Sequence, residues 1–378
     1  MPIYIDVSAA VHQRAGLARY ASRIAHTMIT DHGQRHSFAL FHNGSDSARR
    51  LVGFEGTPIR SVPFGSKPWR MSVWLAHLAR MGFNSLVPGA ELFHSTEHLL
   101  MPLQGVPTVM TVHDLAFNLY PAYHRRLNRW FLNSAMPLFV RRSTALITVS
   151  ESSKRDLMRV YGVPEDKITV TYEAASPAFA PTPAERVAGV RSAHGLPERY
   201  LLTVGTIEPR KNLIRLVQAL QLLRRKDRTL ALVIVGGAGW LYQDFFELLE
   251  RLDEPRSVLL SGYVPEEDLP AIICGAEALV MPSLYEGFGL PVLEAMACGT
   301  PVISSNASSL PELGGAAARY FDPHNTAEMA AAVEAVLSDS ELRHDMRRQG
   351  MAQAARFSWK RTVGETLAVY ERVLKRLP

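Results

Sequence analysis

Two glutamates in the C-terminal half of the chain have the type and spacing needed to hold a sugar. Seven residues separate Glu286 from Glu294, and a glycine-containing turn at 287–290 lies between them. A helix is predicted from about residue 290, so Glu286 precedes the turn and Glu294 lies about one helical turn inside the helix, and both can address one ligand at its N-terminus. Carboxylates accept hydrogen bonds from vicinal hydroxyls, and turn amides suit a diphosphate. A surface turn with a helix-capping glutamate would explain either residue alone but not the full pattern.

A pair of adjacent cations follows an earlier strand of the same half. Arg210 and Lys211 lie in a strand-to-helix turn that starts at Gly205, and a helix is predicted from about Asn212. A guanidinium offers a planar fork to phosphate oxygens and an ammonium offers a compact charge. The pair therefore suits a diphosphate and could offset the charge that develops on a departing nucleotide diphosphate. The alternative is a solvated basic turn, the usual setting of a lone Arg-Lys pair.

A glycine-rich turn at 236–239 also follows a strand, and it is predicted to open a helix. Its amides could approach a phosphate closely. A nicotinamide-binding turn would need a third glycine where Tyr242 stands and an acidic residue after the next strand, where Ser261 and Gly262 stand. The turn, including Gly237, is therefore interpreted as structural or close to a nucleotide.

Histidines follow three apolar runs of the N-terminal half, at His42, His94 and His113. Ligands of parallel α/β sheets sit beyond the carboxyl ends of the strands, so these positions are candidates for chemistry. A hydrogen-bonded loop histidine is the expectation for His42 and His94. His113 is the functional candidate, because the adjoining Asp114 could orient its imidazole.

The sequence contains no metal-binding pattern. No Asp-x-Asp occurs, and no cluster of His, Asp and Glu has ligand spacing for Mg or Mn. We therefore expect no metal and no cofactor, with Arg210 and Lys211 in place of the ion.

Parallel sheets are needed to position these residues, and the apolar pattern predicts them. Short β-rich runs alternate with longer amphipathic segments from end to end, at 3–7, 37–41, 108–112, 145–149, 200–204, 230–235, 257–260, 279–281 and 301–304. A length of 378 residues fits two domains, and three prolines in 176–183 mark a hinge. The prediction is an α/β protein with one Rossmann-like domain over 1–178, a second over 179–357, and a final helix over 358–378 that packs back toward the first.

Composition limits the compartment and the partners. The chain has no cleavable leader and no apolar run long enough to span a bilayer, and its two cysteines form no disulfide framework, which together predict a cytoplasmic protein. The net charge of +5 is uneven, because residues 1–180 hold 19 Lys+Arg against 12 Asp+Glu and residues 181–378 hold 22 against 24. An anionic membrane, a nucleic acid or a phosphate-bearing substrate is compatible with the basic half.

With these motifs the sequence resembles family four of the retaining glycosyltransferases, which have the GT-B architecture of two facing Rossmann-like domains. It is most similar to the bacterial polysaccharide mannosyltransferase-like members. The resemblance covers nearly the whole chain and is most specific at 203–212, 235–237, 286–294 and 297–302. It implies an active site in the cleft between the domains.

The resemblance also implies roles for single residues. Glu286 would bind donor-sugar hydroxyls, Glu294 the ribose, Arg210 and Lys211 the diphosphate, and His113 would be the cleft histidine near the donor sugar. Backbone around 262–264 would read the base. The stretch 15–20 resembles the family's glycine-rich first loop with Ala18 in place of the second glycine, which leaves Gly16 as the contact. The predicted site has no metal ligand and consists of catalytic His113, Arg210, Lys211 and Glu286, of donor-binding Gly16, Gly205, Arg210, Lys211, Gly237, Tyr263, Val264, Glu286, Gly287, Phe288, Gly289, Leu290 and Glu294, and of acceptor-binding Gly16 and Asp114.

The function implied is transfer of a hexose with retained anomeric configuration, mannose from GDP-mannose, to a saccharide or lipid-linked saccharide acceptor in cell-surface polysaccharide or glycoconjugate synthesis. Front-face substitution is favoured, in which the departing phosphate itself receives the acceptor proton. Neither glutamate is committed to the acid or nucleophile role that a two-carboxylate hydrolase requires.

Two segments of the basic half, 68–83 and 123–131, mix aromatic side chains with arginines. Such segments can lie at an anionic lipid surface, and ordinary amphipathic packing is the alternative. Because relatives often use lipid-linked acceptors, peripheral contact with the inner face of the membrane is a hypothesis. Nucleic acid is not an expected partner, since no recognised binding motif accompanies the basic charge.

Three other functions remain open on sequence grounds. They are a UDP-sugar-dependent glycosyltransferase, a nucleotide-sugar epimerase or phosphorylase of the same architecture, and a non-catalytic nucleotide-sugar sensor. Release of epimerised sugar would indicate the epimerase, and donor binding without turnover would indicate the sensor.

Overall fold

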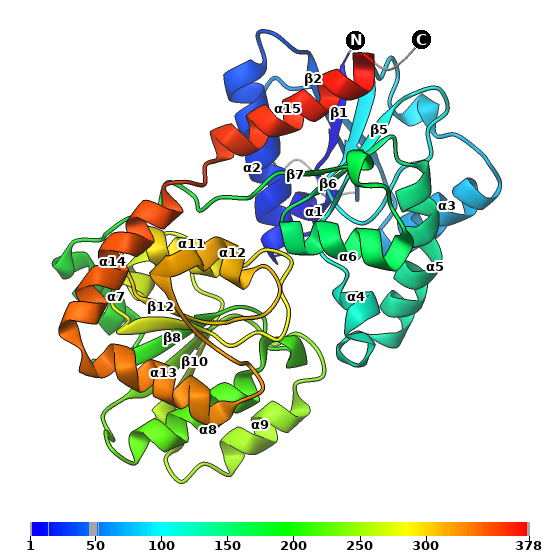
Figure 1. The fold of residues 1–378 in the computed structure, drawn as a ribbon. Coiled ribbons are helices and arrows are strands. Elements are labelled where there is room, and N and C mark those ends of the chain that lie inside the picture. The colour runs from blue at the N-terminus through cyan, green and yellow to red at the C-terminus, as the bar shows by residue number, and fades with distance from the viewer. Residues whose placement is uncertain (1, 14, 45–50, 52, 376–378) are drawn as a thin grey trace. The chain divides into compact units, whose positions relative to one another are not determined.

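The chain folds into two compact units, each built on one parallel sheet (Figure 1). The computed structural model describes residues 2–13, 15–44, 51 and 53–375. Unit 1 comprises Met1–Asn118, Arg126–Glu173 and Ser358–Pro378, and unit 2 comprises Leu119–Arg125 and Ala174–Phe357. The boundary after Glu173 lies five residues before the one predicted at 178.

The sheet of unit 1 has seven strands: β1 (Ile3–Asp6), β2 (Phe38–Asn43), β3 (Ile59–Val62), β4 (Leu92–Ser95), β5 (Thr108–Val112), β6 (Ala145–Thr148) and β7 (Ile168–Val170). Their order is β3-β2-β1-β4-β5-β6-β7, and every neighbouring pair is parallel. The order changes direction between β1 and β4, which is where ligands enter a doubly wound sheet.

Helices cover this sheet: α1 (Ser8–Val11), α2 (Ala15–His32), α3 (Ser66–Leu78), α4 (Ala116–Leu119), α5 (Arg126–Arg142), α6 (Glu151–Tyr161) and α15 (Trp359–Lys375). The α6 helix begins where the Ser150 hydroxyl accepts a hydrogen bond from the Ser153 amide at 3.0 Å, and it ends at Gly162 with a φ of 64°. The C-terminal α15 packs on α2 within unit 1 (Figure 1).

The sheet of unit 2 has six strands: β8 (Tyr200–Val204), β9 (Ala231–Val235), β10 (Val258–Gly262), β11 (Ala278–Met281), β12 (Val302–Ser305) and β13 (Ala318–Phe321). The order is β10-β9-β8-β11-β12-β13, again with every pair parallel. Its switch point lies between β8 and β11, the two strands that precede the predicted cation pair and the first predicted glutamate.

Helices flank both faces of this second sheet (Figure 1). They are α7 (Ala184–Ala193), α8 (Leu213–Arg224), α9 (Gln243–Glu250), α10 (Leu269–Cys274), α11 (Leu290–Ala297), α12 (Leu310–Gly314), α13 (Thr326–Ser338) and α14 (Ser340–Ala354). A buried layer joins α8 and α13 to the strands through Leu216, Leu220, Leu232, Ile234 and Val333. Two parallel sheets with helices on their faces confirm the predicted class of two Rossmann-like domains.

Two histidines predicted in loops lie in strands instead. His42 is inside β2 and His94 is inside β4, and both are fully buried. His94 is satisfied there, because its Nδ1 lies 2.6 Å from the Tyr370 hydroxyl of α15 and its Nε2 lies 2.8 Å from the Thr111 hydroxyl. Burial lowers the pKa of His94 to about 3, so the imidazole is neutral and fits a strand interior.

One segment of unit 2 comes from the N-terminal half of the sequence. Leu119–Arg125 connects two stretches of unit 1 but packs within unit 2. The Tyr120 hydroxyl donates to the Leu284 carbonyl at 3.3 Å, and the Trp240 indole donates to the Tyr123 carbonyl at 2.7 Å. The predicted domain boundaries did not assign this segment to the second domain, because the segment contacts residues more than a hundred positions away in the sequence.

Candidate functional site

The loops that follow β8 and β11 leave the same edge of the unit 2 sheet at its switch point. The first loop carries Arg210 and Lys211 in a 3-10 turn, and the second carries Glu286. Asn212 joins the loops, since its buried side-chain amide donates to the Pro282 carbonyl at 3.0 Å and to the Pro323 carbonyl at 2.8 Å. The switch point therefore brings the predicted cations and the first predicted glutamate together.

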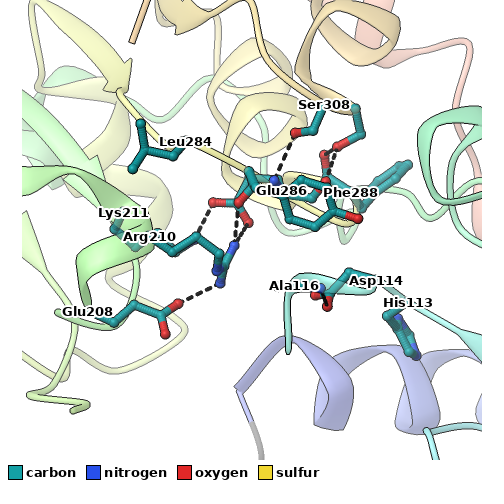
Figure 2. A network of polar contacts seen from close by, with 12 residues as sticks. His113, Asp114, Ala116, Glu208, Arg210, Lys211, Leu284, Glu286, Phe288 and Ser308 are labelled. Atoms are coloured by element: carbon teal, nitrogen blue, oxygen red, sulfur yellow. Dashed lines mark hydrogen bonds and ion pairs between the residues drawn. The ribbon is translucent and has the colours of Figure 1, made fainter. Parts of the chain in front are cut away.

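The carboxylate of Glu286 binds both cations (Figure 2). Its Oε2 lies 2.8 Å from Arg210 Nη1, and its Oε1 lies 2.7 Å from Lys211 Nζ. The second guanidinium nitrogen of Arg210 donates to Glu208 Oε1 at 2.5 Å. All four side chains are buried or nearly so, which makes each charge dependent on the others.

This charge balance fixes the protonation state of Glu286. Burial alone would raise the pKa of the carboxyl group, but the Arg210 guanidinium and the Lys211 ammonium lower it to about 2. Glu286 is therefore an anion at neutral pH, able to accept hydrogen bonds and not to donate them. The Glu208 carboxylate also belongs to this cluster, and no sequence motif indicated it.

Hydrogen bonds from the β12–α12 loop hold the backbone at Glu286. The Glu286 amide donates to the Ser308 hydroxyl at 2.8 Å (Figure 2). The Ser309 hydroxyl lies within hydrogen-bonding distance of the carbonyls of Glu286 and Phe288, at 3.0 and 2.5 Å. Arg210 adds a hydrogen bond from Nη1 to the Tyr285 carbonyl at 2.6 Å. The backbone of the turn at Glu286 is thus held by the two serines of the β12–α12 loop and by Arg210.

Two glycines let the turns approach each other. Gly205 has a φ of 152°, and a Cβ there would lie 3.1 Å from Lys211 Cε. Gly236 has a φ of 148°, and a Cβ there would lie 2.1 Å from the Gly205 carbonyl oxygen. No larger residue fits at position 236 without moving the turn that leads to Lys211. The predicted helix after this turn begins only at Gln243.

Glu294 lies inside α11, four residues after Leu290, the first residue of that helix. It is buried, and Gly289 precedes the helix with a φ of 118°. The helix thus begins at the predicted position, with Glu294 about one turn inside it, and the shared ligand of Glu286 and Glu294 stays a prediction.

Comparison with protein families identifies the chain. A family model described as Glycosyltransferase Family 4 matches residues 14–179, and one described as Glycosyl transferases group 1 matches residues 190–353. The O-antigen chain mannosyltransferase B of Escherichia coli is 36% identical over 265 residues, which are 70% of this chain and 70% of that protein. The chain belongs to the family 4 glycosyltransferases.

Other similarities agree with this assignment. The serotype-specific mannosyltransferase WbdA of Escherichia coli is 29% identical over 75% of this chain, and the match covers 36% of that longer protein. The crystal structure of HepE from Anabaena with UDP and glucose superposes with a TM-score of 0.73 at 19% identity, over all of both chains. That likeness shows the shared GT-B fold.

In unit 1 of this glycosyltransferase, Asp114 does not bond the His113 ring that it was predicted to orient. Asp114 Oδ1 accepts a hydrogen bond from the Ala116 amide at 2.9 Å and so caps α4 (Figure 2). The imidazole is paired instead with Glu173, whose Oε1 lies 3.3 Å from His113 Nδ1. The expectation that Asp114 orients the ring is wrong, because a carboxylate two residues before a helix amide is well placed to bond that amide.

The predicted glycine-rich first loop is helical in this glycosyltransferase. Residues 15–20 form the first turns of α2, and Gly16 is its second residue. A Cβ at Gly16 would meet nothing within 4 Å, and Ala18 suits a helix better than the family's second glycine would. Gly16 therefore presents a helix N-terminus and not a loop.

The positions predicted to read the base differ in exposure. Tyr263 is 87% exposed and follows β10, whereas Val264 is buried. A Cβ at Gly237 would meet nothing within 4 Å, so this glycine leaves open space beside its backbone. The roles of these three residues in donor binding stay predictions.

A cavity of about 330 Å³ in unit 2 has Glu208 in its lining. Its lining includes Tyr123 of the segment Leu119–Arg125, Asn212 and Arg215 at the start of α8, and Tyr242 near α9. Glu208 thus lines this cavity and also pairs with the Arg210 guanidinium, and sequence patterns alone did not indicate the cavity.

Proposed function

We propose that this family 4 glycosyltransferase transfers mannose from GDP-mannose to a saccharide or lipid-linked saccharide with retention of configuration. The observation that carries the proposal is the cluster of Arg210, Lys211 and Glu286 at the switch point of unit 2. Two cations suit a diphosphate, and a carboxylate fixed as an anion suits the hydroxyls of the sugar attached to it. The names of the relatives, mannosyltransferases of O-antigen synthesis, support mannose as the sugar.

The proposed reaction needs no metal and no protein nucleophile. Arg210 and Lys211 would offset the charge on the departing diphosphate, and that phosphate would take the proton of the acceptor hydroxyl on the same face of the sugar. Glu286 is already engaged with both cations, which makes it a binding group and not a free nucleophile. Transfer is therefore expected to continue in EDTA.

Calorimetric titration tests the donor. GDP-mannose is expected to bind more tightly than UDP-glucose, and Lys211→Ala should weaken binding while Glu198→Gln, an exposed change in the same unit, should not. A clear preference for a UDP-sugar would overturn the choice of GDP-mannose. Binding without transfer to any mannoside would favour the sensor, and release of an epimerised sugar would favour the epimerase.

We also propose that unit 1 contacts an anionic membrane through α3 and α5. The two predicted segments meet there, since Trp74 and Trp130 lie edge to face with centroids 5.4 Å apart. Leu75, Leu78 and Leu127 are exposed nearby, Leu127 to 82%. No helix among the described residues has the length and apolar composition to cross a bilayer, so the proposed contact is at the surface.

Vesicle co-sedimentation tests this contact. The protein should bind vesicles that contain phosphatidylglycerol more strongly than pure phosphatidylcholine, and less at high salt. Leu75→Gln with Leu78→Gln should reduce binding severalfold, whereas Met351→Gln, an exposed apolar position of unit 2, should not. Equal binding by the double variant and the parent would refute the proposal.

A further inference from the structure

Each of the four polar atoms of His113 has a partner inside unit 1. In the ring, Nδ1 lies 3.3 Å from Glu173 Oε1 and Nε2 lies 2.9 Å from the Thr96 carbonyl oxygen. In the backbone, the amide donates to His98 Nε2 at 3.0 Å and the carbonyl accepts from the Ser153 hydroxyl at 2.8 Å. Both ring nitrogens of His113, its backbone amide and its backbone carbonyl are therefore held in place by unit 1.

Both ring nitrogens face oxygen atoms, those of the Glu173 carboxylate and of the Thr96 carbonyl, and this arrangement favours the charged ring. A neutral imidazole has one N–H and one lone pair, so it would direct a lone pair at either the Glu173 carboxylate or the Thr96 carbonyl. The imidazolium donates from both nitrogens and satisfies both oxygens. Since Glu173 and His113 are both buried, a charged pair also leaves neither charge uncompensated.

The carboxylates near the ring agree with this assignment. Burial disfavours the charged ring, but the Glu173 carboxylate, the Thr96 carbonyl and the Asp114 carboxylate outweigh it and hold the pKa of His113 above its ordinary value. Glu173 is the last residue of the second stretch of unit 1 and follows β7, so it comes from a different part of the chain than the loop that carries His113.

The two histidines and the tyrosine near the ring carry no charge. Burial lowers the pKa of His94 to about 3 and that of His98 to about 4, and burial raises the pKa of Tyr20, whose ring meets the His113 ring edge to face at 4.7 Å. The positive charge among these groups therefore belongs to His113.

We propose that Glu173 is a positioning residue that holds His113 as an imidazolium with both N–H groups directed into unit 1, so that His113 serves glycosyl transfer as a fixed cation and not as a proton acceptor. The role of this cation in glycosyl transfer rests on the proposed function. A ring without a lone pair cannot take the proton of the acceptor hydroxyl, which leaves that proton to the departing phosphate.

Nitrogen-15 NMR of the histidine rings in the full chain tests the protonation state without any donor. The His113 signal, identified by its loss in His113→Gln, should show two N–H nitrogens at pH 7. In Glu173→Gln the pKa of His113 should fall by about one to three units, and the ring should become neutral near pH 7. Glu165→Gln, which changes an exposed carboxylate of unit 1, should leave the signal unchanged. A neutral His113 in the parent at pH 7 would overturn the proposal, even if Glu173→Gln failed to fold.

Kinetics test the catalytic meaning. With GDP-mannose as donor, kcat of the parent should fall as pH rises through the pKa of His113, and Glu173→Gln should move that fall to lower pH with little change in donor KM. A kcat that instead rises as His113 loses its proton would show a proton acceptor and refute the proposal. Absence of transfer with any donor, together with an imidazolium signal, would contradict the proposed function while leaving the protonation state established.

Discussion

At the residue scale, the single carboxylate of Glu286 binds two cations and, in the proposed function, also a sugar. Its two oxygens provide about four acceptor sites, and Arg210 and Lys211 use one on each oxygen. Sites remain for hydroxyl donors, so sugar binding does not require the ion pairs to break. Glu294 lies within α11, and the ribose that it is predicted to bind does not change during the reaction.

The two glutamates should therefore differ in kinetics. Glu286→Gln should mainly lower kcat, because the sugar gains positive charge in the transition state, and Glu294→Gln should mainly raise the donor KM. Loss of one charge-assisted hydrogen bond, about 1.5–3 kcal/mol, corresponds to roughly ten- to a hundredfold or more in the affected constant. Steady-state kinetics with the nucleotide sugar measure both. Parent-like binding and turnover in both folded variants would show that the pair is not the donor site.

Glu286 should also contribute to acid stability. Because its pKa is about 2 in the folded chain and 4.5 ordinarily, its stabilisation is complete above about pH 5 and is lost as pH falls toward 2. The shift corresponds to about 3 kcal/mol in the free energy of unfolding. Urea titrations should show a difference between the parent and Glu286→Gln that shrinks between pH 5 and pH 2. An unchanged difference over that interval would contradict the assigned ion pairs.

At the element scale, three strand-to-helix turns of unit 2 lie against one another. The Gly205 amide donates to the Val235 carbonyl at 2.9 Å, and the Gly236 amide donates to the Gly262 carbonyl at 2.8 Å. Backbone hydrogen bonds therefore link the turns after β8, β9 and β10, and Gly236 packs against the turn that leads to Lys211.

Substitutions at adjacent glycines test this coupling. Gly236→Ala places a methyl group against the Gly205 carbonyl at a positive φ and should cost about 2–4 kcal/mol of stability, with weaker donor binding. Gly237→Ala is the matched control for stability, since its methyl group meets nothing within 4 Å. Thermal unfolding and titration with GDP-mannose measure both effects. Equal stability of the two variants would show that the turns adjust independently.

At the scale of the whole molecule, the chain leaves and re-enters each unit. Unit 1 contains three separate stretches of sequence, and its C-terminal α15 is joined to the N-terminal strands by buried polar contacts. Tyr370 of α15 bonds His94 of β4, and His94 bonds Thr111 of β5. Arg372 adds a hydrogen bond to the Thr169 hydroxyl of β7 at 2.7 Å. These contacts of unit 1 therefore form only when α15 is in place.

Removal of one hydroxyl tests this dependence. Tyr370→Phe should lower the free energy of unfolding by about 1–3 kcal/mol, because it leaves a buried ring nitrogen of His94 without a partner. Tyr161→Phe is the matched control in the same unit, since the Tyr161 hydroxyl is buried and has no hydrogen-bond partner among the described residues. Denaturant titration distinguishes them. Equal losses in both variants would mean that the α15 contact adds nothing specific.

Sequence alone determined the class of the fold and pointed to Arg210, Lys211 and Glu286, which the structure brings together. Apolar runs at 108–112, 145–149 and 200–204 match strands β5, β6 and β8, because central strands are buried on both faces and leave a continuous apolar signal. The edge strands β3, β7 and β13 were missed, since their side chains are partly exposed and that signal is interrupted. The glutamate spacing and the cation pair were readable because each lies within one short loop or turn.

Only the tertiary structure decided which groups meet. Arg210 and Glu286 are 76 positions apart, and their ion pair exists because β8 and β11 are neighbours at the switch point. Asp114, adjacent to His113 in sequence, caps a helix, while Glu173 pairs with the ring from beyond β7. Local patterns report turns, strands and helices, but the order of strands in a sheet sets the partners of a buried charge, and that order depends on packing across the whole unit.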